Sequence, residues 1–487
     1  MRKHSLLNIL RGSHNELRLL LGLSSGLTYI HVYYPICRLP QLSCLKELEE
    51  LHLYGCNELE YIPELPQSLL KLCVDSCPKL MLPEFDEFKY LEELSIKRYN
   101  SIERMDLSKL NRLKGLDIED CNNLVEIQGQ GKLEFLETIT ICRCKSIGRL
   151  ILPELLCLKR LHALSCNNLV EIRGLDEAEL LEVLDISSYR SIGEILDSPS
   201  LVTPNKKLEK IVLSGLCLKQ LKVHSCDNLV EIQGLDKAEL SEELDISCCK
   251  SIERIPDLSS CVTLKKLEKV VLSGCRSVKK LILPELVCLK QLKVDSCFNL
   301  IEIQGLDKAE LLKELDISSC ESIERLPDLS CFATLKELNI NRCRNLRDVK
   351  SLERFLSCRS IYIEECDSLE KLPNLSKLEN LEHFTLIGSF VTEIPGLEES
   401  GSLKHLRIIE CKEIETLPDL SGCKKLHALM MLSCEKLTQL RGLEKLDLRY
   451  LEICECNSLE TQPKLPETNA GCSCDPWYED VDCIILR

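Results

Sequence analysis

The sequence predicts an α/β repeat solenoid built on a long parallel β-sheet, and three observations lead to this fold class. Leu accounts for 98 of the 487 residues, whereas aromatic residues make up only 4%. Three aliphatic positions and a cysteine, first complete at Leu48, Leu51, Leu53 and Cys56, return every 21–23 residues through most of the chain. No aliphatic run approaches the length of a membrane-spanning helix. A fixed period of this length is typical of a continuous stack of repeats and not of separate globular domains.

The repeated motif reads L-x-x-L-x-L-x-x-C. Nineteen copies are well formed, from the copy that begins at Leu27 to the copy that begins at Leu448, and 15 of them have Cys at the ninth position. A twentieth copy, at Leu208, Ile211 and Leu213, is compressed. This motif is the signature of the leucine-rich repeat. The sequence therefore predicts about 19–20 repeats in a horseshoe, with a parallel concave β-sheet and short irregular or helical convex segments.

Each part of a repeat has its own justification. The L-x-L alternation has the period of a β-strand, so its leucines face inward and its other side chains face the open, concave side. The rest of each repeat crosses the back, where residues such as Ile252 and Ile255 close the core. The ninth-position cysteines are small and readily buried. We expect free thiols there, with side chains that run parallel into the core and do not face each other.

The extent of the period predicts three segments. Residues 1–26 form an N-terminal cap or partial repeat, residues 27–463 form the solenoid, and residues 464–487 form a C-terminal cap. A larger duplication lies in the middle, where the segment 168–174 returns at 228–234 and at 299–305. Near the middle copy about a dozen residues are missing by comparison with the third. This difference predicts an irregularity near residues 208–218.

We expect no catalytic, cofactor-binding or metal site. Residues 22–26 match the nucleophile-elbow motif G-x-S-x-G, but a strand is expected after them where that motif needs a helix. Cys472, Cys474 and Cys483 have neither a nearby His nor the spacing of a zinc site. The net charge of −16 disfavours binding to nucleic acid. The basic N-terminus is not followed by a secretory signal, so we expect no membrane association and a cytoplasmic address, with the nucleus as a further one.

The open face of the predicted sheet differs along the chain. In the middle its residues are small or acidic, at Asp185, Ser187, Asp245, Ser247, Asp316 and Ser318. We define the N-terminal patch as Tyr29, His31, Tyr33, His52 and Tyr54. We define the C-terminal patch as Tyr362, His383, Ile387, His405, Arg407, Ile409, Met430, Leu432 and Tyr450. Contiguous apolar and aromatic side chains on a polar face are typical of interfaces. We expect the C-terminal patch to bind a protein partner and the N-terminal patch to dock intramolecularly, unless the caps cover them.

One longer segment supports a resemblance to a known family. Residues 249–259 read Cys-Lys-Ser-Ile-Glu-Arg-Ile-Pro-Asp-Leu-Ser, and close copies stand at 320–330, 366–376 and 411–421. In this style the solenoid resembles the leucine-rich-repeat region of plant intracellular disease-resistance receptors, especially the class with a TIR signalling domain. The resemblance implies recognition of a pathogen effector or of a guarded host protein, in defence signalling.

The TIR domain and the nucleotide-binding domain of that family are missing from the sequence. We therefore expect a protein that recognises its target without a nucleotide switch of its own, and whose N-terminal patch docks on such domains. The alternative is a general cytosolic leucine-rich-repeat scaffold, or the substrate-receptor arm of a ubiquitin ligase.

Overall fold

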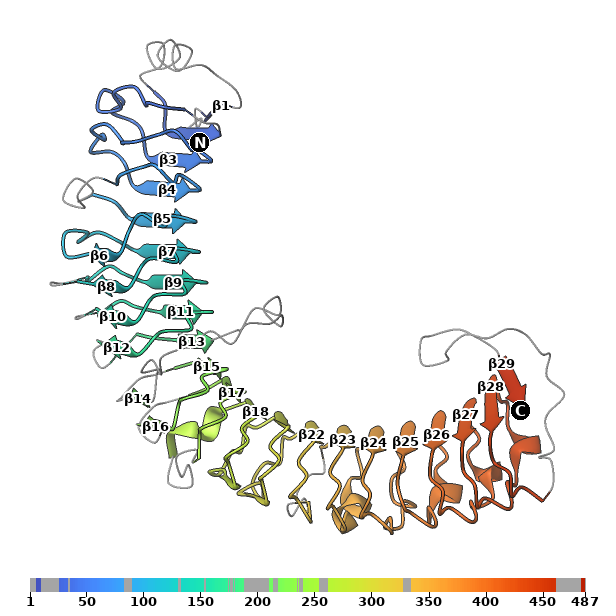
Figure 1. The fold of residues 1–487 in the computed structure, drawn as a ribbon. Coiled ribbons are helices and arrows are strands. Elements are labelled where there is room, and N and C mark those ends of the chain that lie inside the picture. The colour runs from blue at the N-terminus through green and yellow to red at the C-terminus, as the bar shows by residue number, and fades with distance from the viewer. Residues whose placement is uncertain are drawn as a thin grey trace, which may run out of the picture. The chain divides into compact units, whose positions relative to one another are not determined.

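The computed structural model describes the following residues: 6–9, 26–33, 36–82, 90–129, 133–152, 155–173, 175, 178, 180–187, 210–212, 218–233, 235, 240–253, 262–326, 334–460 and 483–486. The chain divides into two compact units, Met1–Leu240 and Ser241–Arg487. Each unit is a stack of short parallel strands (Figure 1).

The first unit contains one parallel sheet in which each strand pairs with the next strand of the stack. Its strands are β1 (Leu6–Ile9), β2 (Tyr29–Tyr33), β3 (Glu50–Tyr54), β4 (Lys71–Asp75), β5 (Glu93–Lys97), β7 (Gly115–Glu119), β9 (Thr138–Cys142), β11 (Arg160–Leu164), β13 (Val183–Ser187) and β15 (Gln220–His224). The pairing is in register, so that Leu51 lies opposite Leu72. The inward aliphatic residues form a continuous buried column.

The second unit repeats this arrangement. Its strands are β17 (Glu243–Ser247), β18 (Lys269–Ser273), β20 (Gln291–Asp295), β22 (Glu314–Ser318), β23 (Glu337–Asn341), β24 (Ser360–Glu364), β25 (His383–Ile387), β26 (His405–Ile409), β27 (Ala428–Leu432), β28 (Tyr450–Cys454) and β29 (Cys483–Leu486). Apart from β1 and β29, these strands and those of the first unit are the 19 well-formed copies of the motif. The predicted leucine-rich-repeat solenoid with a parallel sheet is confirmed.

The back of each unit is built from short strands and 3-10 turns. In the first unit β6 (Arg104–Asp106), β8 (Glu126–Gln128), β10 (Arg149–Ile151) and β12 (Glu171–Arg173) form a second parallel sheet. The second unit has the strand pair β19 (Lys280–Ile282) and β21 (Glu302–Gln304) and the 3-10 turns η4 (Val262–Lys266), η5 (Lys350–Arg354), η6 (Leu397–Glu399), η7 (Leu420–Gly422) and η8 (Leu443–Lys445). Sequence analysis did not predict this second row of strands. Within the described ranges the back contains no α-helix.

The compressed twentieth copy is not a repeat strand. Residues Lys210–Val212 form β14, which pairs with β16 (Glu231–Gln233) in a separate two-stranded sheet. The main sheet passes directly from β13 to β15. The irregularity predicted near residues 208–218 is therefore present at Lys210–Val212, although nearly the same residues form a main strand in β18. The rest of the predicted irregularity at 208–218 lies largely outside the described residues.

The eighth position of the motif ends each strand with a left-handed turn. In 17 repeats this residue has a positive φ between 48° and 65°, and only three of the 17 are glycine, at Gly55, Gly274 and Gly388. Its backbone N–H donates to a carbonyl of the next strand, as Arg342 does to Glu364 at 2.8 Å. The turn bends the chain away from the strand direction. The ninth side chain therefore returns to the core.

The ninth-position cysteines follow this turn directly, and their side chains point into the core. Fourteen of the 15 are buried, with at most 8% of their surface exposed, and Cys456 is half-buried. Their thiols donate to carbonyls of their own repeat and of the preceding one, as Cys343 does to Asn341 at 3.6 Å and to Ile317 at 3.4 Å. In four places the pKa of one thiol is lowered by the thiol of a neighbouring repeat. These are Cys77 beside Cys56, Cys121 beside Cys144, Cys297 beside Cys320, and Cys456 beside Cys434.

We expect every cysteine of the isolated protein to be a free thiol. All 25 cysteines whose side chains the structure describes are free. Alkylation after denaturation without reductant, followed by mass measurement, should add a label to each of the 31 cysteines. In the folded protein Cys343 and Cys411 should react slowly, because burial raises the pKa of each thiol to about 11. Labels on only a handful of cysteines after denaturation would contradict this expectation.

Candidate functional site

The apolar part of the C-terminal patch lies on the open face of β25–β28. Ala428, Met430 and Tyr450 form one apolar cluster, and Ile409 and Leu432 pack against it. Met430 and Tyr450 are only 7% and 6% exposed, so they form the floor of the patch and not its surface. The accessible apolar surface of the patch comes from three half-buried side chains on neighbouring strands. They lie opposite each other in the register of the sheet and form a row of Ile387, Ile409 and Leu432.

Two tyrosines of this patch are held by their own strands. The hydroxyl of Tyr362 donates to Glu364 and that of Tyr450 donates to Glu452, each at 2.5 Å. Burial and the Glu364 carboxylate raise the pKa of Tyr362 to about 12. Arg407 is half-buried and stands between Thr385 and Met430 in the register of the sheet. The structure therefore brings the predicted residues of β24–β28 together on one face, with the aromatic rings oriented by neighbouring carboxylates.

The histidines of the patch form a row with a third histidine that sequence analysis missed. The rings of His383 and His405 stack with centroids 4.5 Å apart, and the ring of His427 lies 4.6 Å from that of His405. His427 stands immediately before β27, so the alternation within the strand gave no reason to place it here. Burial lowers the pKa of His383, and burial next to the other two histidines lowers the pKa of His405 to about 4.

We expect this histidine row to make the second unit less stable as the pH falls from about 6.5 to about 4. His405 binds a proton less readily in the folded state than in the unfolded state, so the unfolded state takes up more protons over this range. The nearby charges are Glu382, which pairs with Lys404 at 2.7 Å, and Glu337 near His383. The free energy of unfolding of His405→Gln, followed by chemical denaturation, should fall less over this range than that of the wild type.

The matched variant for this measurement is His162→Gln in the first unit, which should follow the wild type in the transition of the second unit. A difference between wild type and His405→Gln that stays constant from pH 6.5 to pH 4 would exclude a role of His405 in the pH dependence.

The N-terminal patch is a compact aromatic cluster on β2 and β3. The rings of Tyr33 and Tyr54 stack at 4.6 Å, and those of Tyr29 and His52 lie 5.0 Å apart. His31 lies 5.0 Å from Tyr33 and 5.8 Å from His52. All five predicted side chains are thus in one group, and Tyr33 is the most exposed at 44%. Burial, with a smaller effect of His52, lowers the pKa of His31.

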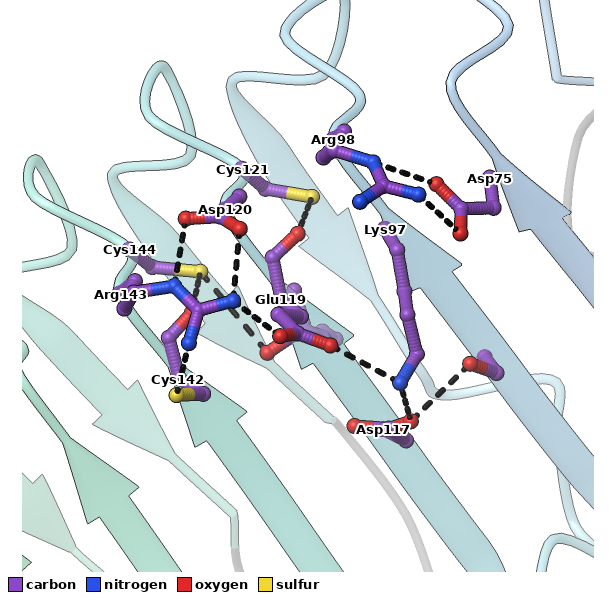
Figure 2. Close-up of polar contacts among 12 residues, drawn as sticks. Asp75, Lys97, Arg98, Asp117, Glu119, Asp120, Cys121, Cys142, Arg143 and Cys144 are labelled. Atoms are coloured by element: carbon purple, nitrogen blue, oxygen red, sulfur yellow. Dashed lines mark hydrogen bonds and ion pairs between the residues drawn. The ribbon is translucent and has the colours of Figure 1, made fainter. Parts of the chain in front are cut away.

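The open face beyond this cluster carries charges that pair with each other, as Figure 2 shows. Arg98 contacts both carboxylate oxygens of Asp75, at 2.8 and 2.7 Å. Lys97 lies 2.8 Å from Asp117 and 2.9 Å from Glu119. Because these charges are satisfied within the sheet, this part of the face presents a solvated surface with little gain for a partner.

Arg143 closes the same network on the next strand. It contacts both oxygens of Asp120 at 2.9 Å and also reaches Glu119. The separate Arg98–Asp75 pair lies beside the N-terminal patch, since the guanidinium of Arg98 lies 5.5 Å from the centre of the Tyr54 ring. Sequence analysis missed these arginines because they stand at the eighth position, outside the strand alternation.

The small and acidic residues predicted for the middle also satisfy one another. The hydroxyl of each serine donates to the aspartate two residues before it, at 2.7 Å for the first pair and 2.5 Å for the other two. The pairs are Ser187 with Asp185, Ser247 with Asp245, and Ser318 with Asp316. Ser187 and Ser318 are nevertheless buried, at 2% and 9% exposed, so the expectation of a solvated face does not hold at these two positions.

The parallel strands, one for each copy of the motif, define the protein as a leucine-rich-repeat solenoid. No protein-family model matches the chain, and no curated protein sequence matches it. In the described ranges no helix has the length and apolar character to cross a membrane. The same ranges contain no cluster of three His, Cys, Asp or Glu residues that could hold a metal ion.

Three solved structures have similar folds. A leucine-rich-repeat protein of Leptospira interrogans is 15% identical, with 89% of this chain and 95% of that chain covered and a TM-score of 0.38. The functional domain of InlJ from Listeria monocytogenes, which includes a cysteine ladder, is 14% identical, with 91% and 65% covered and a TM-score of 0.33. The internalin InlF of Listeria monocytogenes is 14% identical, with 75% and 87% covered and a TM-score of 0.34.

Proposed function

We propose that this protein is a non-enzymatic binding platform, which recognises a pathogen effector or a guarded host protein in plant defence signalling in the cytoplasm. The observation that supports it is the row of half-buried Ile387, Ile409 and Leu432, three consecutive apolar side chains on the open face of the sheet. The plant context comes from the resemblance of the repeat style. A general cytosolic scaffold would use the same surface, so the proposal differs from that alternative in the partner alone.

The physical basis is a preformed apolar site. Ile409 and Leu432 rest on the buried side chains of Met430 and Tyr450, so their positions are fixed before a partner arrives. Fixed anchors lose little conformational entropy on binding. Arg407 lies beside them, and arginine and tyrosine are enriched among the residues that contribute most to binding. Repeats without such a patch would offer a partner no preformed apolar contact.

The test is a binding screen of the chain against a collection of plant-pathogen effectors, followed by calorimetry on each partner found. The double variant Ile409→Asp and Leu432→Asp should bind at least about 100-fold more weakly, because two charges would then be buried in the interface. The matched control is Val271→Asp, which places the same charge on the half-buried open-face valine of β18. The proposal is wrong if the double variant binds normally, or if Val271→Asp loses as much affinity.

The N-terminal patch supports a second role in intramolecular docking. A cluster of five aromatic rings with Tyr33 exposed is an apolar surface suited to a neighbouring domain. Separately produced TIR and nucleotide-binding domains of a plant receptor should bind the chain, and the variant Tyr33→Ser with Tyr54→Ser should weaken that binding. Equal binding by this variant and the wild type would contradict the docking role.

A further inference from the structure

We infer that the C-terminal patch binds an amphipathic helical segment whose apolar side is flanked by lysine and arginine. This inference rests on the proposed function and names the chemistry of its partner. The flank of basic residues is expected on the side that faces the C-terminal ends of strands β24–β28.

The C-terminal patch carries an excess of negative charge. Five carboxylates stand on the open face of β24–β28 or at the left-handed turns after these strands, and Glu410 and Glu455 among them are exposed. The five are Glu364, Glu365, Glu410, Glu452 and Glu455. Arg407 is the one open-face arginine or lysine of these five strands. Arg342, from the preceding repeat, pairs with Glu365 at 3.1 Å. The excess of carboxylates attracts a basic partner and repels phosphate backbones and anionic lipid surfaces.

The second argument is the position of these charges relative to the apolar row. Ile387, Ile409 and Leu432 occupy the seventh position of three consecutive repeats, and the eighth position of the middle one is Glu410. Glu365 and Glu455 stand at the eighth position of the two flanking repeats, so three carboxylates border the row along one edge. The opposite ends of the strands carry Arg359, Lys404 and Arg449 beside Glu382. The site is thus acidic on one side only, which fixes the side on which the partner places its basic residues.

The third argument is the spacing of the row. Neighbouring strands lie about 4.8 Å apart, so the row presents one apolar side chain every ~4.8 Å across the sheet. A helix laid across the strands presents its apolar side once per turn of about 5.4 Å. An extended segment repeats one face only every ~6.6 Å. The helix matches the row more closely over three repeats.

The experiment selects peptides from a random-peptide phage library on the immobilised full chain. Peptides enriched on the wild type should combine apolar residues at helical spacing with lysine or arginine along one flank. They should bind the variant Glu410→Lys with Glu455→Lys at least about 10-fold more weakly. Selection on that variant should enrich peptides without the basic flank. The matched control, Asp245→Lys with Asp316→Lys, places the same charges on open-face positions of β17 and β22 and should keep the affinity of the wild type.

The outcomes separate this inference from the proposed function. Enriched peptides that are acidic or uncharged, and that still lose binding to Ile409→Asp with Leu432→Asp, would overturn the inference and leave the proposed binding patch intact. Peptides that bind this apolar-row variant as tightly as the wild type would overturn both. A selection that enriches no sequence on the wild type over the apolar-row variant would also count against both.

Discussion

Replacing Phe384 by Ala should lower the free energy of unfolding of the second unit by about 3–5 kcal/mol. The side chain is fully buried in β25, where it takes the place of the usual leucine between Ile361 and Leu406. Removing the ring leaves a cavity that the neighbouring strands cannot close, because each is held in register by the next. Chemical denaturation of the variant, monitored by far-UV circular dichroism, measures the loss.

The same repeat contains a matched control. Phe390 lies six residues later and is 50% exposed, so Phe390→Ala should change the free energy of unfolding by less than about 0.5 kcal/mol. Equal losses for the two variants would show that β25 does not pack in the way described.

Replacing Gly305 by Ala should cost about 3 kcal/mol or more. Gly305 has φ = 85°, a region that residues with a Cβ rarely adopt. A Cβ at this position would lie 1.9 Å from the carbonyl oxygen of Leu283, in the preceding repeat. That oxygen belongs to the backbone and cannot rotate away, so one of the two chain segments must shift.

Gly401→Ala is the control for this change. No atom lies within 4 Å of a Cβ built on Gly401, and its φ lies outside the left-handed region. This variant should keep the midpoint of denaturation or raise it slightly, because alanine restricts the unfolded chain. If Gly305→Ala unfolds at the same denaturant concentration as Gly401→Ala, the close approach of the two repeats is wrong.

For the candidate site, the sequence predicted which side of the sheet each residue faces, but not how deeply each side chain is buried. The alternation within a strand placed Ile409 and Leu432 on the open face, and the structure has them there. The same alternation placed Met430 and Tyr450 beside them, yet these two are buried. Alternation tells which side of the sheet a residue faces, but the depth of a side chain depends on the side chains of the neighbouring strands.

The motif could not predict the contacts of residues that lie outside the strands. His427 joins the histidine row although it precedes β27, and Arg98 joins a charged network although it follows β5. The position of Lys210–Val212 outside the main sheet could not be predicted either, because nearly the same residues form a main strand in β18. In each case the outcome depends on what lies one repeat away.

The sequence by itself determined the fold class, the 19 repeat strands of the main sheet and their inward side chains. This was possible because the period-two alternation and the 21–23-residue repeat are local properties of the sequence, and the same pattern occurs in 19 copies. Only the tertiary structure decided which open-face side chains are buried, which charges pair, and which copy left the main sheet. These outcomes depend on contacts between residues about 22 positions apart in the sequence, whose side chains meet only when the repeats stack.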